Sequence, residues 1–593
     1  LVVAWYHGEK GRQRVSGPEL LMVAGILAVA GAAIALVGSE GTDGAGVLPV
    51  TDETSASGEG GASVKAADPA TSADSVPSRS VGVLPLDDHS PDPGDAYFAP
   101  AMTEAITNAL QKIPDLHVSA RNSAEQFTDS GMTVREFAVG ELGVAHAIEG
   151  SVQIQGDRAH VTVQLIDAQT GGHLWSETYE EALADVVDVQ VRIARAVAEQ
   201  LAAAFTDRAE ERIRAGSTED PEALELYLEA MAIDTETPED LDREIALLRE
   251  AVARDPGFSL ASGALAELFY RKQTVTRDER FTDSLAAYIQ QAIDSADHPS
   301  IEARHRILRD IYFGDDIGAV VRLLRQSYRT NPSDPWINWA LGATYALAGD
   351  LSEAVRWHRR TISIDPLRPD YRFTLGRIYM MLGLDSVARR AMEEGRELAD
   401  EPGGGLWLKF QYHLLRNELD VAMSYVDSLR ALGDPYVVVG EGAVHLRRGE
   451  LDSARKILER VDEQPLALRQ WSEAPMVAHV MLSTGDTARA EALLRQAEDV
   501  PGAPLDIFTG SELEMKIAAV RGDAEAATEA LRRLTEEGGR SARWYRESPI
   551  YSRVRDDPEF QAALAEQEQL IARERREVER MLAEDEAGVG GRE

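Results

Sequence analysis

The stretch LGATYALAGDLSEA (341–354) returns 34 residues later as LGRIYMMLGLDSVA (375–388). Five positions keep their residue type at this spacing: Leu341, Gly342, Tyr345, Gly349 and Ala354 recur as Leu375, Gly376, Tyr379, Gly383 and Ala388. A self-match at a fixed period of roughly 20–50 residues is typical of proteins built from stacked structural repeats. The sequence therefore predicts an array in which each unit buries its apolar face against the next.

The recurring residues explain how one unit folds as a pair of helices. Gly342 removes a side chain where the two helices meet, and the ring of Tyr345 fills the space between them. Gly349 ends the first helix, because the left-handed conformation found there is easiest for glycine. Ala354 lets the second helix approach closely, and Pro366 stops that helix because proline cannot continue it.

This period and these residue types resemble tetratricopeptide repeats. The five-residue step from turn glycine to helix alanine recurs at 449–454, 485–490 and 522–527, with less regular spacings of 36 and 37 residues. We therefore expect an all-α tetratricopeptide-repeat superhelix over residues 221–538. An irregular helical bundle is the alternative.

Stacked helical pairs form a superhelix whose concave face binds an extended peptide or a helix. The sequence therefore predicts a protein or peptide partner in this groove. Aromatic residues outside the repeat signature are the candidate partner contacts: Trp336, Trp339, Trp357, Tyr371 and Tyr412. The alternative for each is packing between neighbouring repeats.

Residues 20–38 read LLMVAGILAVAGAAIALVG, a run without a charged residue. At 1.5 Å per residue such a helix nearly matches a hydrocarbon core of about 30 Å, so we expect a transmembrane helix. A buried core helix and a signal peptide are the alternatives.

The segments on either side of this run set the expected topology. Residues 1–19 are interpreted as the end of an upstream membrane segment followed by a basic loop with Lys10, Arg12 and Arg14, which the positive-inside rule places in the cytoplasm. The expected location is therefore the inner membrane, with the soluble region in the periplasm. Residues 39–79, rich in Gly, Ala, Ser, Thr and Asp, are expected to form a flexible linker.

Residues 80–205 predict a small α/β domain with a mixed sheet. Apolar runs at 80–86 and 116–120 indicate short buried strands. Three alternating segments between 145 and 180 are separated by the turn residues Gly156-Asp157 and Gly171-Gly172, which indicates hairpins. Helical patterns at 101–113, 133–142 and 183–205 complete the order β-α-β-α-β-β-β-α.

This domain resembles the TolB-amino-terminal-like (FlgO-like) module of bacterial membrane proteins. The resemblance is carried by VGVLPL (81–86), ELGV (141–144), IEGSV (148–152), VQLIDAQTG (163–171) and LWSE (174–177). Pro100-Ala101 and the 145–147 segment depart from the family pattern. The resemblance implies a non-catalytic accessory domain, often found with a kinase, cyclase or winged-helix domain upstream.

The residues after the array, 541–593, are interpreted as a capping helix and tail, because a terminal repeat needs a polar outer face. A short coiled seam through Leu564, Ile571 and Val578, spaced by seven, is the alternative.

Charge and composition exclude several functions. The chain has 61 basic and 101 acidic residues, a net charge of −40, so polyphosphate is repelled and nucleic acid is a poor partner. The absence of cysteine excludes thiolate metal sites and cysteine nucleophiles. Asp87, Asp88 and His89 follow the first strand, but a solvated acidic loop explains them better than a metal site. No zinc-protease, P-loop or GxSxG motif occurs.

We therefore expect no catalytic, cofactor-binding or metal-binding residue and no enzyme activity in this chain. The predicted function is a membrane-anchored scaffold for protein–protein interaction through the repeat groove, in signalling or in the cell envelope. The alternative is the sensor half of a larger regulatory protein whose kinase, cyclase or DNA-binding domain lies upstream of Leu1.

Overall fold

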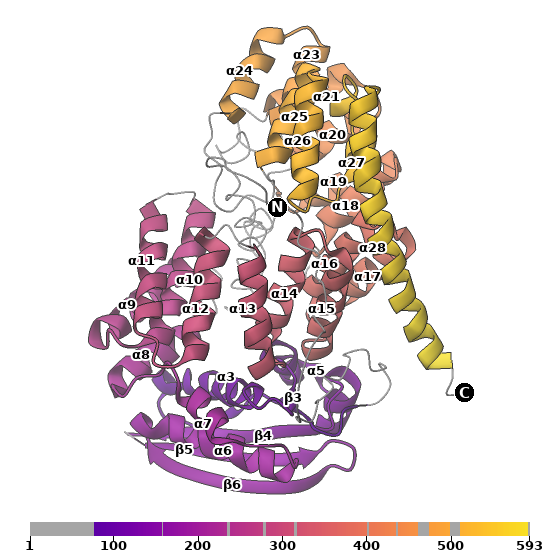
Figure 1. The fold of residues 1–593 in the computed structure, drawn as a ribbon. Helices are drawn as coiled ribbons and strands as arrows, with labels where there is room; N and C mark the ends of the chain where they lie inside the picture. Colours follow the sequence, from indigo (N-terminus) through magenta and orange to yellow (C-terminus); the bar gives the residue numbers. More distant parts are fainter. Residues whose placement is uncertain are drawn as a thin grey trace, which may run out of the picture.

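A computed structural model describes residues 76–590, apart from 157, 234–237, 277–279, 314–316, 400–402, 435–436, 461–473 and 499–509. A small sheet lies at one end, and helices stack away from it toward the C-terminal region (Figure 1). The long helix α28 (Pro558–Gly590) runs back along the stack (Figure 1).

The sheet is mixed, with the strand order β3-β1-β4-β5-β6. Its strands are β1 (Ser80–Val83), β2 (Asp87–Asp88), β3 (His117–Val118), β4 (His146–Gln155), β5 (Arg158–Asp167) and β6 (Gly172–Ala182). β1 is parallel to both β3 and β4, whereas β4, β5 and β6 are antiparallel. β2, which the sequence analysis interpreted as a loop, pairs with β4.

Two helices cover one face of this sheet, α3 (Phe98–Gln111) and α6 (Val186–Gln200). Val161, Val163 and Leu165 of β5 are buried in the core with them, while the alternate residues Thr162 and Gln164 are only partly buried. This alternation follows from the two-residue period of a strand.

Short elements connect the strands and lead out of the sheet: η1 (Pro93–Asp95), α4 (Arg121–Glu125), α5 (Phe127–Ser130), η2 (Glu136–Glu141), η3 (Leu183–Asp185) and α7 (Asp207–Arg214). η2 lies within the helix predicted at 133–142, but it is a π-helix. The Thr133 hydroxyl and the Glu136 carboxylate cap its start reciprocally.

Antiparallel helical pairs then follow one another along the chain. They are α8 (Pro221–Met231) with α9 (Pro238–Arg254), α10 (Ser259–Thr276) with α11 (Arg280–Asp294), α12 (Pro299–Phe313) with α13 (Ile317–Thr330), α14 (Pro335–Leu347) with α15 (Leu351–Ile364), α16 (Pro369–Met381) with α17 (Asp385–Leu398), α18 (Leu406–Leu415) with α19 (Leu419–Ala431), α20 (Val437–Arg447) with α21 (Leu451–Leu458), α23 (Ala474–Ser483) with α24 (Thr487–Glu498), and α25 (Gly510–Arg521) with α26 (Ala524–Glu536). The prediction of tetratricopeptide-like helical repeats is confirmed at this level.

The chain turns back after α26 through α27 (Ala542–Glu547) and η5 (Pro549–Tyr551). α28 then packs on α26 and on α15, far earlier in the chain. Arg575 of α28 donates to the carbonyl oxygen of Leu382, and Glu574 accepts from the backbone N–H of Ser352 at 3.1 Å. The C-terminal helix therefore ties the end of the array back to its middle.

The predicted fold class needs correction at its first element. The transmembrane helix was expected at 20–38, which lies outside the described residues, as do 1–19 and most of 39–79. Within the described ranges, no helix has both the length and the apolar composition needed to cross a bilayer. The 33 residues of α28 are long enough but carry many charged side chains. The described fold is a mostly helical repeat array with a small mixed sheet, and the expected inner-membrane, periplasmic location is corrected with it.

Candidate partner-binding face

The first helices of successive pairs lie on one side of the array. α10 contacts α12, α16 contacts α18, and α23 contacts α25, in each case past the intervening second helix. We call this side the first-helix face. In stacked helical repeats such a continuous surface is where an extended partner binds.

The repeat-signature residues lie inside the pairs and hold this face together. Leu341, Tyr345, Leu375, Tyr379, Ala354 and Ala388 are buried. A methyl group on Gly342 would lie 2.8 Å from Nε2 of His358, and one on Gly376 would lie 2.9 Å from Cγ of Met392. Each glycine therefore lets a large side chain of the second helix pass close to the first.

The remaining signature residues lie in turns: Gly349 and Gly383 follow first helices, and Pro366 follows the second helix α15. Gly349 and Gly383 both have a positive φ after their first helix, 77° and 71°. Pro366 lies in the turn between α15 and α16. Its neighbour Asp365 accepts a hydrogen bond from the Ser123 hydroxyl at 2.5 Å, so this turn meets the sheet domain.

The candidate partner contacts divide by exposure. Trp339, Tyr371 and Tyr412 are buried, so their rings pack inside the protein. Trp357 is partly buried on the second helix α15, where its ring meets that of Tyr328 at 4.8 Å. Trp336 is partly buried on the first helix α14 and is the member of this group that lies on the first-helix face.

Charged residues of three consecutive first helices meet beside Trp336. The guanidinium of Arg304 on α12 lies 5.1 Å from the Trp336 ring centroid, a cation–π contact. It also lies 3.9 Å from the carboxylate of Glu267 on α10 and 4.0 Å from that of Asp334. Burial raises the pKa of Glu267, and the nearby Arg304 opposes this shift.

Glu267 and Arg304 are not predicted from the sequence, because the earlier pairs lack the full repeat signature. A different sequence feature could have located them. The Asn331-Pro332 pair follows the end of α13 and so marks where the next first helix, α14, begins. Counting one unit back from that break would have placed Arg304 on a first helix.

Arg377 extends the same face on α16. Its side chain is exposed, and among the described residues no carboxylate forms an ion pair with it. Surrounding protein nevertheless lowers the pKa of its guanidinium by desolvation. The group stays charged at neutral pH, because arginine begins from a very high value.

One end of the first-helix face is covered by the sheet domain. α3 packs against α8, and Ala101 of α3 belongs to the core of the first repeats. Lys112, which follows α3, has its pKa lowered to about 8 by burial and by the cations Arg304 and Arg212. The sheet domain therefore brings a further cation close to Arg304.

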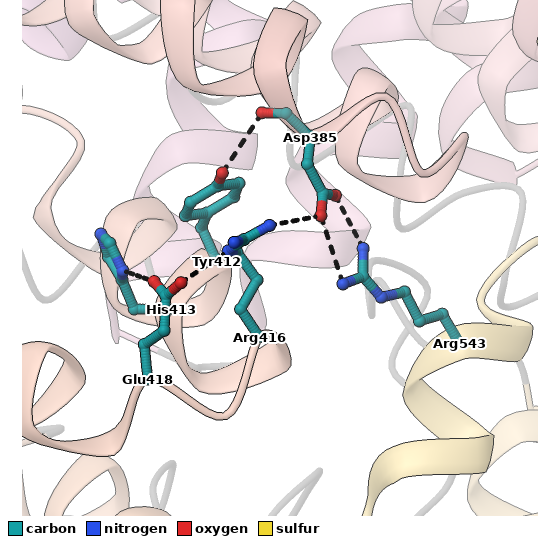
Figure 2. A network of polar contacts seen from close by, with 6 residues as sticks. All are labelled: Asp385, Tyr412, His413, Arg416, Glu418 and Arg543. Carbon is teal, nitrogen blue, oxygen red and sulfur yellow. Dashed lines mark hydrogen bonds and ion pairs between the residues drawn. The ribbon is translucent and has the colours of Figure 1, made fainter.

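A polar network around α17 to α19 joins the C-terminal region to the middle of the array (Figure 2). The Asp385 carboxylate accepts from Arg416 at 2.8 Å and from Arg543 at 2.7 Å. The backbone oxygen of Asp385 accepts from the Tyr412 hydroxyl at 3.3 Å. Glu418 pairs with Arg416 and with His413 at 2.9 and 2.6 Å.

The acidic loop considered as a metal site has another role in the fold. Asp87 and Asp88 form the exposed strand β2, and the His89 backbone N–H donates to the Val152 oxygen at 2.8 Å. Across the described ranges, no three His, Asp or Glu side chains are grouped to hold a metal ion.

Comparison with known proteins gives one sequence relative and several structural neighbours. No family model matches the chain. A protein of Rhizobium meliloti (strain 1021) named "Putative adenylate cyclase 3" is 33% identical over 221 residues, which are 36% of this chain. The match spans only 37% of that relative's length.

Solved structures with similar helical stacking have low identity. PilW, a widely conserved type IV pilus biogenesis factor, matches with a TM-score of 0.29 at 18% identity, over 35% of this chain and 92% of its own. Yeast Tom70 matches with a TM-score of 0.29 at 13% identity, over 68% of this chain and 92% of its own. The repeat architecture of this chain therefore rests on its own helix pairs.

Proposed function

We propose that this protein is a non-enzymatic scaffold that binds a protein or peptide on the first-helix face of its repeat array. In this proposal residues 221–538 form the binding array, and residues 80–205 form an accessory domain of the TolB-amino-terminal-like type. The central part of the face, from α12 to α16, is the binding region.

The arrangement of Arg304, Trp336 and Arg377 is the observation that supports this region. Trp336 supplies a large, partly buried ring at low entropic cost, which is typical of residues that dominate binding energy. Arg304 supplies a partly buried cation and Arg377 an exposed one on a protein with a net charge of −40. These cations attract an acidic protein segment locally, whereas the net negative charge of the whole surface repels polyphosphate.

Affinity capture with charge-reversed variants tests the proposal. The full chain and its variants Arg304→Glu and Arg377→Glu are used as bait, and captured proteins are compared by mass spectrometry. Arg389→Glu is the matched control, since Arg389 is an exposed cation on the second helix α17. We expect a partner retained by the wild type and the control but lost from the other variants. Equal capture by all four proteins would count against this face.

A second candidate function is supported by the cyclase-like relative. In this reading the chain is the accessory or sensor half of a regulatory protein whose catalytic domain lies upstream. The support is the 33% identity over 221 residues. A cyclase activity in the same polypeptide is proposed only by analogy with the name of that relative.

The size and activity of the native protein test this second candidate. Immunoprecipitation from source cells with an antibody against residues 80–590 would yield a polypeptide well above 64.7 kDa that forms cyclic AMP from ATP. A native product of about 64.7 kDa that lacks cyclase activity would remove this candidate and leave the scaffold proposal in place.

A further inference from the structure

The first-helix face of the C-terminal pairs is covered by the chain's own residues 541–551. α27 contacts the first helix α18, and η5 contacts the first helices α23 and α25. Ile550 and Tyr551 of η5 are buried in the core of these pairs. This segment, which we call the return segment, therefore lies where a partner of these repeats would lie.

Trp544 is one apolar anchor of the return segment, beside the buried Tyr545. Its ring packs against three separate hydrophobic clusters, which contain Leu415, Leu414 and Val477 respectively. It remains partly exposed and is not part of any of the three cores. An aromatic side chain inserted between packed clusters in this way is typical of a ligand anchor.

Ion pairs fix the orientation of the segment on both sides of Trp544. Arg543 donates to Asp385 at 2.7 and 3.3 Å. Glu547, one helical turn later, lies 3.7 Å from Arg447, whose side chain is only 8% exposed. Burial lowers the pKa of Arg447, and the charge of Glu547 opposes this shift. The surface under the return segment therefore offers an acidic group at the start of the second helix α17 and a basic group on the first helix α20, which pair with residues one helical turn apart, and apolar contacts for Trp544 between them.

We propose that this face is a second binding site, specific for a short helix that presents Arg, Trp, Tyr and Glu in the order Arg-Trp-Tyr-x-Glu. The return segment occupies the site within the molecule, and a partner helix of the same chemistry binds by displacing it. This inference rests on the proposed scaffold function and adds the chemistry of the partner and the control of its access.

The return segment is suited to displacement. α27 has only six residues, too few to persist as an isolated helix, so its contacts with the face hold it in place. Its covalent attachment gives it a high effective concentration at the site. A partner helix therefore binds weakly to the intact chain and strongly once the anchors of the segment are removed.

A labelled peptide of residues 538–557 tests the proposal by fluorescence anisotropy against the full chain. We expect the affinity for the Arg543→Ala/Trp544→Ala variant to be at least about tenfold higher than for the wild type, since two of the anchors that hold the segment in the site are removed. Arg546→Ala is the matched control, because Arg546 pairs with Glu568 of α28 and not with the face. A peptide with Ala in place of its tryptophan is expected to bind none of these proteins.

A second measurement does not depend on the stability of that variant. The chain has no cysteine, so Arg546→Cys provides a single position for a spin label on the return segment. Excess unlabelled peptide should increase the mobility of the label, and the Trp-to-Ala peptide should not. An immobile label together with unchanged peptide affinity in a folded variant would overturn the proposal.

These outcomes are separable from those of the capture experiment. The capture variants lie on α12 and α16, whereas the peptide site lies on α17 to α25. Peptide binding without partner capture would support the second site alone. Partner capture without peptide binding would support the scaffold and reject the second site.

Discussion

Arg543 and Asp385 are 158 residues apart in the sequence, yet two hydrogen bonds of 2.7 and 3.3 Å join them. The same carboxylate also accepts from Arg416 of α18 (Figure 2). One acidic side chain at the start of α17 thus ties the C-terminal return of the chain to the middle of the array. The contact closes what would otherwise be an open superhelix.

A double-mutant cycle measures the strength of this closure. Asp385→Ala and Arg543→Ala should show a coupling energy of about 0.5–1 kcal/mol in urea unfolding, since both side chains are partly exposed. The exposed pair Arg389 and Glu393 within α17 is the control, with an expected coupling of about 0.3–0.5 kcal/mol. A coupling near zero for Asp385 and Arg543 would mean that this ion pair does not contribute to the closure.

Gly538 makes the closest backbone approach of this return. Its φ is +100°, and a Cβ there would lie 2.0 Å from the Leu347 oxygen and 2.9 Å from the Gly349 nitrogen. Gly433 has a similar φ of +75° with no atom within 4 Å of the added Cβ. Gly433→Ala therefore measures the conformational cost alone, about 1–2 kcal/mol. Gly538→Ala should cost about 1–3 kcal/mol more in urea unfolding, through the clash. Equal losses would show that the return is loosely packed.

The repeat could be predicted from sequence because its determinants are local. Gly342, Tyr345 and Gly349 act within one helical pair, and the same residues recur at the next pair. Each contacts a residue about one helix length away in the sequence, and at this short separation the spacing alone decides which side chains meet. The small mixed sheet followed from local alternation for the same reason.

The closure and the exposure of single side chains could not be predicted in this way. The meeting of Arg543 with Asp385 depends on the accumulated curvature of several pairs, to which each irregular spacing contributes. The burial of Trp339 and Tyr371 depends on which neighbours reach them from adjacent pairs and turns. The contact between Arg304 and Trp336 depends on the register between two units, and only one of them carries the signature.

Ser123 joins the sheet domain to the turn between α15 and α16. Its hydroxyl donates to the buried Asp365 carboxylate at 2.5 Å and accepts from the Leu367 N–H at 3.0 Å. Ser123→Ala leaves buried polar groups on the repeat side without this partner, so we expect a loss of about 1–3 kcal/mol in unfolding free energy. Ser424→Ala, which removes an exposed hydroxyl on α19, should cost less than about 0.5 kcal/mol. Similar effects for both variants would indicate that the two parts do not stabilise each other at this turn.

His358 is expected to make the stability of the array sensitive to acid. Its ring is fully buried against Gly342, and in the described structure neither ring nitrogen has a hydrogen-bond partner. Burial, reinforced by the charge of Arg377, lowers the pKa of His358 from 6.5 to about 3.

The sign of the pH dependence follows from this depressed pKa. Between pH 6.5 and about 3 the unfolded chain binds a proton at residue 358 and the folded chain does not. The contribution of the neutral ring to stability is therefore complete above pH 6.5 and is lost progressively as the pH falls toward 3.

His358→Met copies the pairing of Gly376 with Met392, so it should be tolerated at pH 7 and reduce the loss at pH 5 by roughly 1–2 kcal/mol. Urea unfolding at both pH values measures this difference. The exposed His173 on β6 provides the control, because His173→Met should leave the acid profile as it is in the wild type. An unchanged profile for His358→Met would show that water reaches the ring as the pH falls.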